Sequence, residues 1–307
     1  MKRIKVGIIG LGDIAQKVYL PLLVHDERIR IVGIMTRNKT NLKQLCEKYH
    51  IKKGYTDVNE LLLQDLDAVF VHSSTDSHYQ IIKKCLNRNL HVYVDKPLSN
   101  HIKESMELVN LAEQKQLLLC VGFNRRFAPQ YIEAKNWMDE VGGFDTCIVQ
   151  KHRTQLQNLT ARHTIYDDLI HIVDLLLWIG AGVKEVSSYT RNVDKNERLL
   201  NASGHLIFGS SSGFFSMNRQ SGADIESLEL NGGGRSVKIT NMEQTAFYDL
   251  KTGEHYKPFG SWDTILYRRG FVGVVDHFLE TLHKPETCTV RAEQVLETHL
   301  LMEQLSK

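Results

Sequence analysis

Gly10-Leu11-Gly12-Asp13-Ile14-Ala15 follows an apolar stretch at residues 4–9, and this short turn decides the fold. Its pattern is G-x-G-x-x-A, placed between a predicted strand and a predicted helix. Gly10 permits a tight turn, Gly12 lets a pyrophosphate approach the backbone, and Ala15 allows close packing of helix on strand. The helix N-terminus offers N–H groups and a partial positive charge to that pyrophosphate. The turn is therefore predicted to bind a dinucleotide.

Apolar runs and amphipathic segments alternate through the first 122 residues. This alternation predicts βαβ units and a parallel sheet. The strands are nearly continuous Val, Ile and Leu, as expected for a sheet that is covered on both faces. Residues 1–122 are predicted to form a Rossmann domain. The expected strands are residues 4–9, 30–35, 68–72, 91–94 and 117–121, and the expected helices are residues 14–23, 40–49, 77–86 and 102–114.

A different pattern begins after Phe123. Residues 183–250 read as consecutive strands separated by turns, without helices between them. This pattern predicts an antiparallel sheet in an α+β domain. The expected fold class is α/β, with a doubly wound parallel Rossmann sheet in residues 1–122 and a large, mostly antiparallel open sheet in residues 123–307. The helices expected around this second sheet are residues 129–140, 166–179, 268–282 and 292–305.

Composition narrows the range of partners. Lys and Arg together number 38 against 36 for Asp and Glu, so the chain has no basic excess to attract nucleic acid. No stretch approaches the roughly 18 apolar residues that a membrane span requires. The five cysteines are scattered, as is usual in a reducing compartment. We expect a cytoplasmic protein with a small-molecule substrate and with neither nucleic acid nor membrane as a partner.

The end of the second predicted strand bears on the choice of cofactor. An Asp or Glu at this point would bind the ribose 2′-hydroxyl of NAD. This chain has Thr36 and Arg37 there instead, and a hydroxyl beside a guanidinium suits a 2′-phosphate. NADP is therefore the expected cofactor, with NAD as the alternative. Arg37 stacked on adenine or pointing into solvent stays open as another interpretation.

Two further patterns contain residues suited to catalysis. Asp95-Lys96-Pro97 follows a strand where a doubly wound sheet presents its ligand crevice. Asp167, His171 and Asp174 would share one face of a regular helix, at i, i+4 and i+7. A histidine with a carboxylate one turn away can act as a general base. The residues alone also allow a plain surface turn and an ordinary amphipathic helix.

Taken in order, the motifs at residues 10–15, 95–97, 122–127 and 167–174 resemble those of the Gfo/Idh/MocA oxidoreductase family. The resemblance covers nearly the whole chain. The run at residues 69–78 looks like the MviM-like branch, whose label as a virulence factor is an association and not a chemistry. Two departures from the family pattern are present. Ser74 and Thr75 stand in place of a common Pro-Asn pair, and Asp95 in place of a common Glu.

The resemblance implies hydride transfer between a nicotinamide and a sugar, a polyol or a related compound, without a metal. It also implies a homodimer or homotetramer formed through the C-terminal sheet. Lys96 matches the lysine that contacts nicotinamide and substrate, His171 the acid/base residue, and Asp167 the carboxylate one turn before it. In the oxidative direction His171 would take the hydroxyl proton while Lys96 stabilises the oxyanion. Asp167 would orient the substrate.

The expected contacts form two sets. The substrate set joins Lys96, Asp167 and His171 to the polar residues Asn124, Arg126 and Arg153. A non-catalytic nucleotide- or sugar-sensing protein on the same fold is one alternative. A reductase acting on an imine or a tetrapyrrole is another. The expected cofactor set is Gly10, Gly12, Asp13, Ile14, Ala15, Thr36, Arg37, Ser73, Ser74, Thr75, His78, Asp95 and Lys96.

Overall fold

The computed structural model describes residues 3–307, which divide into two compact units. The first unit ends at Gly122 and also contains Val275–Leu296. The second comprises Phe123–Val274 and Glu297–Lys307. No helix within residues 3–307 is long and apolar enough to cross a membrane.

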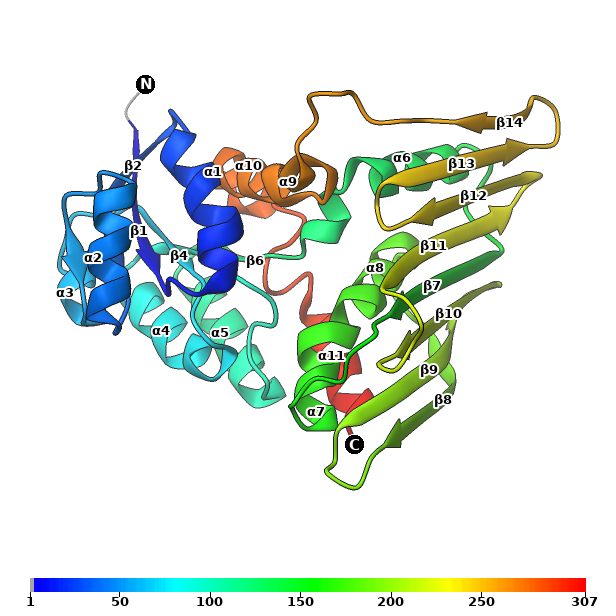
Figure 1. Cartoon of the computed structure of the whole chain (residues 1–307), viewed down its shortest axis with the longest axis horizontal. Coiled ribbons are helices and arrows are strands. Elements are labelled where there is room, and N and C mark those ends of the chain that lie inside the picture. Colours follow the sequence, from blue (N-terminus) through cyan, green and yellow to red (C-terminus); the bar gives the residue numbers. More distant parts are fainter. Residues whose placement is uncertain (1–2) are drawn as a thin grey trace. The chain divides into compact units, whose positions relative to one another are not determined.

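The first unit is built on a six-stranded parallel sheet in the order β3-β2-β1-β4-β5-β6 (Figure 1). All residues of β4 are buried, so both faces of the sheet are covered. The strand order reverses between β1 and β4, and ligands of doubly wound sheets bind where that happens. The strands are β1 (Ile4–Ile9), β2 (Ile29–Met35), β3 (Gly54–Tyr55), β4 (Ala68–Val71), β5 (His91–Val94) and β6 (Leu119–Val121).

The helices of this unit agree with the sequence prediction in place but not in every detail. The expected helix at residues 14–23 opens with a π turn, and the short β3 and α3 were not predicted. Both of these elements are too short to show a hydrophobic period. The helical segments are η1 (Ala15–Tyr19), α1 (Leu20–His25), α2 (Lys39–Lys48), α3 (Val58–Leu62), α4 (Thr75–Asn87) and α5 (Ile102–Gln114).

The second unit contains an eight-stranded sheet in the order β14-β13-β12-β11-β7-β10-β9-β8. Only the β7–β10 pair is parallel among its described pairings, so the expected mostly antiparallel sheet is confirmed. Its strands are β7 (Thr146–His152), β8 (Glu185–Val193), β9 (Leu199–Phe208), β10 (Ser211–Asn218), β11 (Ile225–Gly232), β12 (Arg235–Thr240), β13 (Gln244–Asp249) and β14 (Gly253–Tyr256).

Helices cover one face of this sheet (Figure 1). Along β7, buried residues alternate with half-buried ones, as expected for a strand with one covered face. Gly270, with φ +77°, separates α9 from α10, where one helix was expected at residues 268–282. The remaining helical segments of the chain are η2 (Asn124–Phe127), α6 (Pro129–Asp139), α7 (Ala161–Thr164), η3 (Ile165–Leu169), α8 (Ile170–Gly180), α9 (Ile265–Arg268), α10 (Phe271–Thr281), η4 (Pro285–Thr287) and α11 (Leu296–Leu305).

Candidate cofactor and catalytic sites

Gly10 forms the tight turn that ends β1. Its φ is +86°, and a Cβ atom there would lie 2.3 Å from the backbone nitrogen of Ser73. An L side chain meets both backbone strain and a direct clash at such a position. Gly10 therefore serves the protein's own packing, because it lets β1 approach the end of β4.

Gly12 serves a different purpose. A Cβ atom on Gly12 would have no protein atom within 4 Å, so packing within the protein does not demand a glycine. Gly12 instead borders a pocket of about 510 Å³ in the first unit. A side chain there would enter the space through which a pyrophosphate approaches the backbone. The residues present therefore fit a bound dinucleotide.

The helix that follows the turn directs its N-terminal end at this region. Its first backbone hydrogen bond runs from Gln16 N–H to the Gly12 carbonyl, 3.1 Å away. N–H groups in the first turn of a helix have no partner inside the helix and suit an anion. Ala15 is fully buried, which fits its expected packing role. The side chains of Asp13, paired with Lys17, and of Ile14 are exposed and do not line the pocket.

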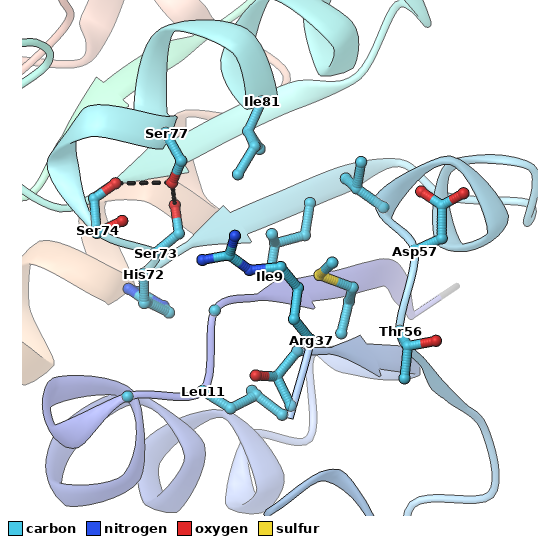
Figure 2. A pocket seen from close by; sticks show the side chains of 15 residues that line it. Ile9, Leu11, Arg37, Thr56, Asp57, His72, Ser73, Ser74, Ser77 and Ile81 are labelled. Atoms are coloured by element: carbon cyan, nitrogen blue, oxygen red, sulfur yellow. Dashed lines mark hydrogen bonds between the residues drawn. The ribbon is translucent and has the colours of Figure 1, made fainter. Parts of the chain in front are cut away.

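Thr36 and Arg37 both line the pocket, where the sequence predicts the adenosine ribose. Figure 2 shows the Arg37 side chain reaching into the pocket from the end of β2. Within residues 3–307, Arg37 has no hydrogen-bond or ion-pair partner. Its guanidinium is therefore available to an anionic ligand group.

The loop after β4 supplies another wall of the pocket. Ser73 and Ser74 line it as expected, together with Ser77, which the sequence prediction omitted. The Ser77 hydroxyl donates to the Ser74 carbonyl at 2.7 Å and shares a 2.8 Å hydrogen bond with the Ser73 hydroxyl, as Figure 2 shows. Thr75 opens α4 and does not line the pocket. The other lining residues that were not predicted are Ile9, Leu11, Met35, Thr56, Asp57, Val58, His72 and Ile81.

His78 is buried beside the pocket and does not line it. Its ring nitrogens lie 2.9 Å from the Pro97 carbonyl and 3.0 Å from the Ser73 carbonyl. Burial, the largest effect, holds the pKa of His78 below its ordinary value. The side chain thus ties the loop after β4 to the loop after β5, which contains Lys96.

Asp95 anchors the segment that precedes Lys96. Its carboxylate accepts a hydrogen bond from the Tyr19 hydroxyl at 2.8 Å and lies 2.9 Å from His72 Nδ1. Burial alone would raise the pKa of Asp95, but His72 and the Tyr19 bond hold it below its ordinary value. Asp95 does not line the pocket. Because it is held by Tyr19 and His72, it fixes the backbone immediately before Lys96.

In the second unit, the expected regular helix through Asp167 contains a π turn over Ile165–Leu169. The regular α-helical spacing on which the shared face was predicted is thus wrong for this stretch. Asp167 accepts a hydrogen bond from the Gln157 amide at 2.9 Å. His171 Nδ1 lies 2.6 Å from Arg125 Nη1. Asp174 is fully buried and accepts two bonds from Arg126, at 2.9 and 2.6 Å.

Beside these residues the second unit buries a cluster of charges. Asp168 pairs with Lys151 and Arg219. Glu226 accepts two hydrogen bonds from Arg125, at 2.5 and 2.8 Å. Burial opposes charge on Glu226, but Arg125 overcomes it and lowers the pKa of Glu226 to about 2. Burial and then the charge of Arg125 lower the pKa of Lys151 to about 8.

Three residues of the expected substrate set make contacts within the second unit. The Asn124 amide donates to the Arg269 carbonyl at 2.7 Å, and Arg126 is held by Asp174. Arg153 donates to the His152 carbonyl at 2.8 Å and keeps 27% of its side chain exposed. Arg125 was missed, although it stands in the same motif as Arg126. Within residues 3–307, no group of three or more His, Cys, Asp or Glu side chains could hold a metal ion.

A parallel sheet with a glycine turn, and a pocket where its strand order reverses, is the fold that binds dinucleotide cofactors. Residues 4–123 match the model of an oxidoreductase family, GFO_IDH_MocA, with an NAD-binding Rossmann fold. Residues 129–249 match the model of the YceM-like C-terminal domain.

Individual proteins agree with these matches. The chain is 35% identical to YceM of Salmonella typhimurium over 306 residues, 99% of this chain and 98% of YceM. The crystal structure of the dehydrogenase MviM from Clostridium difficile superposes with a TM-score of 0.93 at 35% identity, covering 99% of both chains. Myo-inositol 2-dehydrogenase of Thermotoga maritima is 29% identical over 138 residues, 43% of this chain and 39% of that enzyme. The chain belongs to the Gfo/Idh/MocA family of NAD(P)-dependent oxidoreductases.

Proposed function

We propose that this enzyme transfers a hydride between the nicotinamide of NADP and a sugar, a polyol or a related hydroxy or carbonyl compound. The observation that carries the proposal is the pocket bordered by Gly12 and Arg37, which fits a dinucleotide with a 2′-phosphate. The similarity to an inositol dehydrogenase supports a polyhydroxylated substrate. The chain's own location is proposed to be the cytoplasm.

The proposed catalytic residues are Lys96, His171 and Asp167. The nicotinamide supplies or accepts the hydride. Lys96 holds the reacting oxygen and stabilises the negative charge that develops on it. His171 exchanges a proton with that oxygen, and Asp167 orients the substrate. Arg153 is the best suited of the expected substrate-binding arginines, because its side chain is partly exposed while Arg126 is committed to Asp174.

The remaining cofactor contacts are proposed from the pocket. Backbone groups of the turn at Gly12 receive the pyrophosphate, while Ser73 and Ser74 bind along the opposite wall. Thr36 and Arg37 receive the 2′-phosphate. We also propose that the enzyme is a homodimer or homotetramer, assembled through the sheet face that helices leave uncovered. Phe214 and Tyr248, 38% and 42% exposed, point away from the covered face and suit such a contact.

The cofactor assignment is tested by titrating the protein with NADPH and NADH while following nicotinamide fluorescence. We expect the protein to prefer NADPH. Arg37→Ala is expected to weaken NADPH binding by about 10- to 100-fold, because charged hydrogen bonds contribute about 1.5–3 kcal/mol. NADH binding should change little. Lys52→Ala removes an exposed charge outside the pocket lining and serves as the control.

Preferential binding of NADH, with Arg37→Ala without effect, would contradict the 2′-phosphate assignment and leave the dinucleotide site intact. Failure to bind either cofactor would contradict the proposed function itself.

A further inference from the structure

The position of Arg125 against His171 is set from the opposite side by Glu226. Arg125 is 8% exposed and lies in η2, while Glu226 is 3% exposed and lies in β11. Arg125 Nε and Nη2 donate to the two carboxylate oxygens, at 2.5 and 2.8 Å. This paired contact fixes the plane of the guanidinium. The remaining nitrogen, Nη1, is thereby directed at His171 Nδ1, 2.6 Å away.

This contact decides where the proton of His171 resides. A guanidinium donates hydrogen bonds and cannot accept them. His171 Nδ1 must therefore accept, so it carries no proton. The neutral ring then carries its proton on Nε2. An imidazolium would instead set a second N–H, and a second positive charge, against Arg125.

His171 joins a buried cluster of charges through its contact with Arg125. In that cluster Arg125, Lys151, Arg153 and Arg219 face the carboxylates Asp168 and Glu226. The positive charge of Arg125, directly beside the ring, disfavours a further cation on it. The other titratable or charged groups nearby are Arg126 with Asp174, Asp167 beside Gln157, Tyr131, His152 and the exposed Asp224.

We infer that Arg125 is a positioning residue that holds His171 as a neutral imidazole with its proton on Nε2, so that this nitrogen is the one that exchanges a proton with the reacting oxygen. The inference rests on the proposed function and adds which ring nitrogen of His171 takes part. In carbonyl reduction a bound reduced nicotinamide would supply the hydride and itself be oxidised. As the hydride adds to the carbonyl carbon, the electron pair of the broken C=O π bond moves to oxygen. That oxygen takes the Nε2 proton of His171.

The ring left behind is an imidazolate, and Arg125 provides the positive charge beside it. Water then returns a proton to Nε2 and leaves as hydroxide, so each reduction takes one proton from the solvent. Use of a neutral histidine as a hydrogen-bond donor to a carbonyl has precedent in enzymes. The reverse reaction passes through the same forms of the ring, so the Arg125 contact determines which nitrogen exchanges the proton in both directions.

The first test is the ring ¹⁵N spectrum of histidine-labelled protein. The chain has 14 histidines, so the signals of His171 are identified by their loss in His171→Asn. We expect an unprotonated Nδ1 and a protonated Nε2 that stay unchanged as the pH is lowered through about 6.5, where ordinary histidines titrate. A ring protonated on Nδ1, or one that becomes an imidazolium at or above that pH, overturns the inference.

Two variants then test whether the protonation state of His171 affects the rate of carbonyl reduction. Arg125→Lys keeps the charge but cannot pair with both Glu226 oxygens and also reach His171. We expect the ring of His171 to lose its single tautomer in this variant and to take up a second proton more readily than in wild type, because Nδ1 is no longer occupied by the guanidinium. Carbonyl reduction should then fall as the pH rises through that titration, whereas wild-type reduction has no such step. Glu226→Gln, which loosens Arg125 without removing it, should produce the same change in weaker form.

Arg162→Lys is the matched control, because Arg162 pairs with Glu303 elsewhere in the second unit. It should leave the His171 signals unchanged, and a change there as large as in Arg125→Lys would contradict a specific effect of Arg125. Different results would contradict the inference about the ring proton and the proposed function of the enzyme. Full reductase activity in His171→Asn would remove the proposed catalytic role, whatever the spectrum. A requirement for His171 together with a proton on Nδ1 would overturn only the inference.

Discussion

Replacing Lys96 by alanine is expected to lower the rate of hydride transfer by on the order of 100- to 1,000-fold, the usual effect of removing one group that stabilises an oxyanion. The chain positions this lysine through its neighbours. Asp95 is fixed by Tyr19 and His72, and the Pro97 carbonyl contacts His78. The loss should therefore be one of chemistry, since these supports remain in the variant.

Steady-state turnover, NADPH affinity and thermal melting of Lys96→Ala separate the possible outcomes. NADPH affinity and the melting temperature should stay close to wild type. Lys103→Ala, which removes an exposed lysine of the same unit, should leave all three measurements unchanged. A large fall in melting temperature for Lys96→Ala would mean that Lys96 has a structural role and would contradict its proposed part in catalysis.

Alanine at Gly10 and alanine at Gly12 are expected to have opposite consequences, although the two glycines belong to one motif. Gly10→Ala should destabilise the fold by about 2–5 kcal/mol, because the new Cβ atom meets both a strained backbone and the Ser73 nitrogen. Gly12→Ala should leave stability within about 0.5 kcal/mol of wild type, because no protein atom lies nearby.

Although Gly12→Ala should hardly change stability, it should weaken NADPH binding. Its alanine variant should lose at least about tenfold in NADPH affinity, equivalent to about 1.4 kcal/mol, because the methyl group enters the space of the pyrophosphate. Urea unfolding and fluorescence titration of both variants provide the two values. A Gly12→Ala protein that binds NADPH as tightly as wild type would contradict the placement of the pyrophosphate at this turn.

The sequence predicted those parts of the cofactor site that local chemistry determines. The glycine turn, the strand before it and the residues at the end of β2 can all be recognised from a few neighbouring positions. Thr56, Asp57 and Val58 could not be found in this way. Thr56 and Asp57 connect β3 to α3, and Val58 opens α3; these two elements have two and five residues and are too short to show a period.

Prediction was weaker in the second unit, where the important contacts join distant parts of the chain. Arg125 and Glu226 are separated by 101 residues, so no local pattern indicates their pairing. Asp167 and Asp168 are adjacent in sequence, yet only Asp168 is buried, with Lys151 and Arg219 as its partners. The π turn that contains both carboxylates also leaves no distinct mark on the hydrophobic pattern.

The central claim, hydride transfer to a polyhydroxylated carbonyl compound, is tested most directly by following deuterium. The protein is incubated with NADPH carrying deuterium at C4 and with a panel of keto-sugars and keto-inositols, and the products are analysed by mass spectrometry. The account predicts an alcohol with deuterium on the former carbonyl carbon, strongly reduced in Lys96→Ala and in His171→Asn. Tight NADPH binding with every compound of the panel recovered free of deuterium would contradict it.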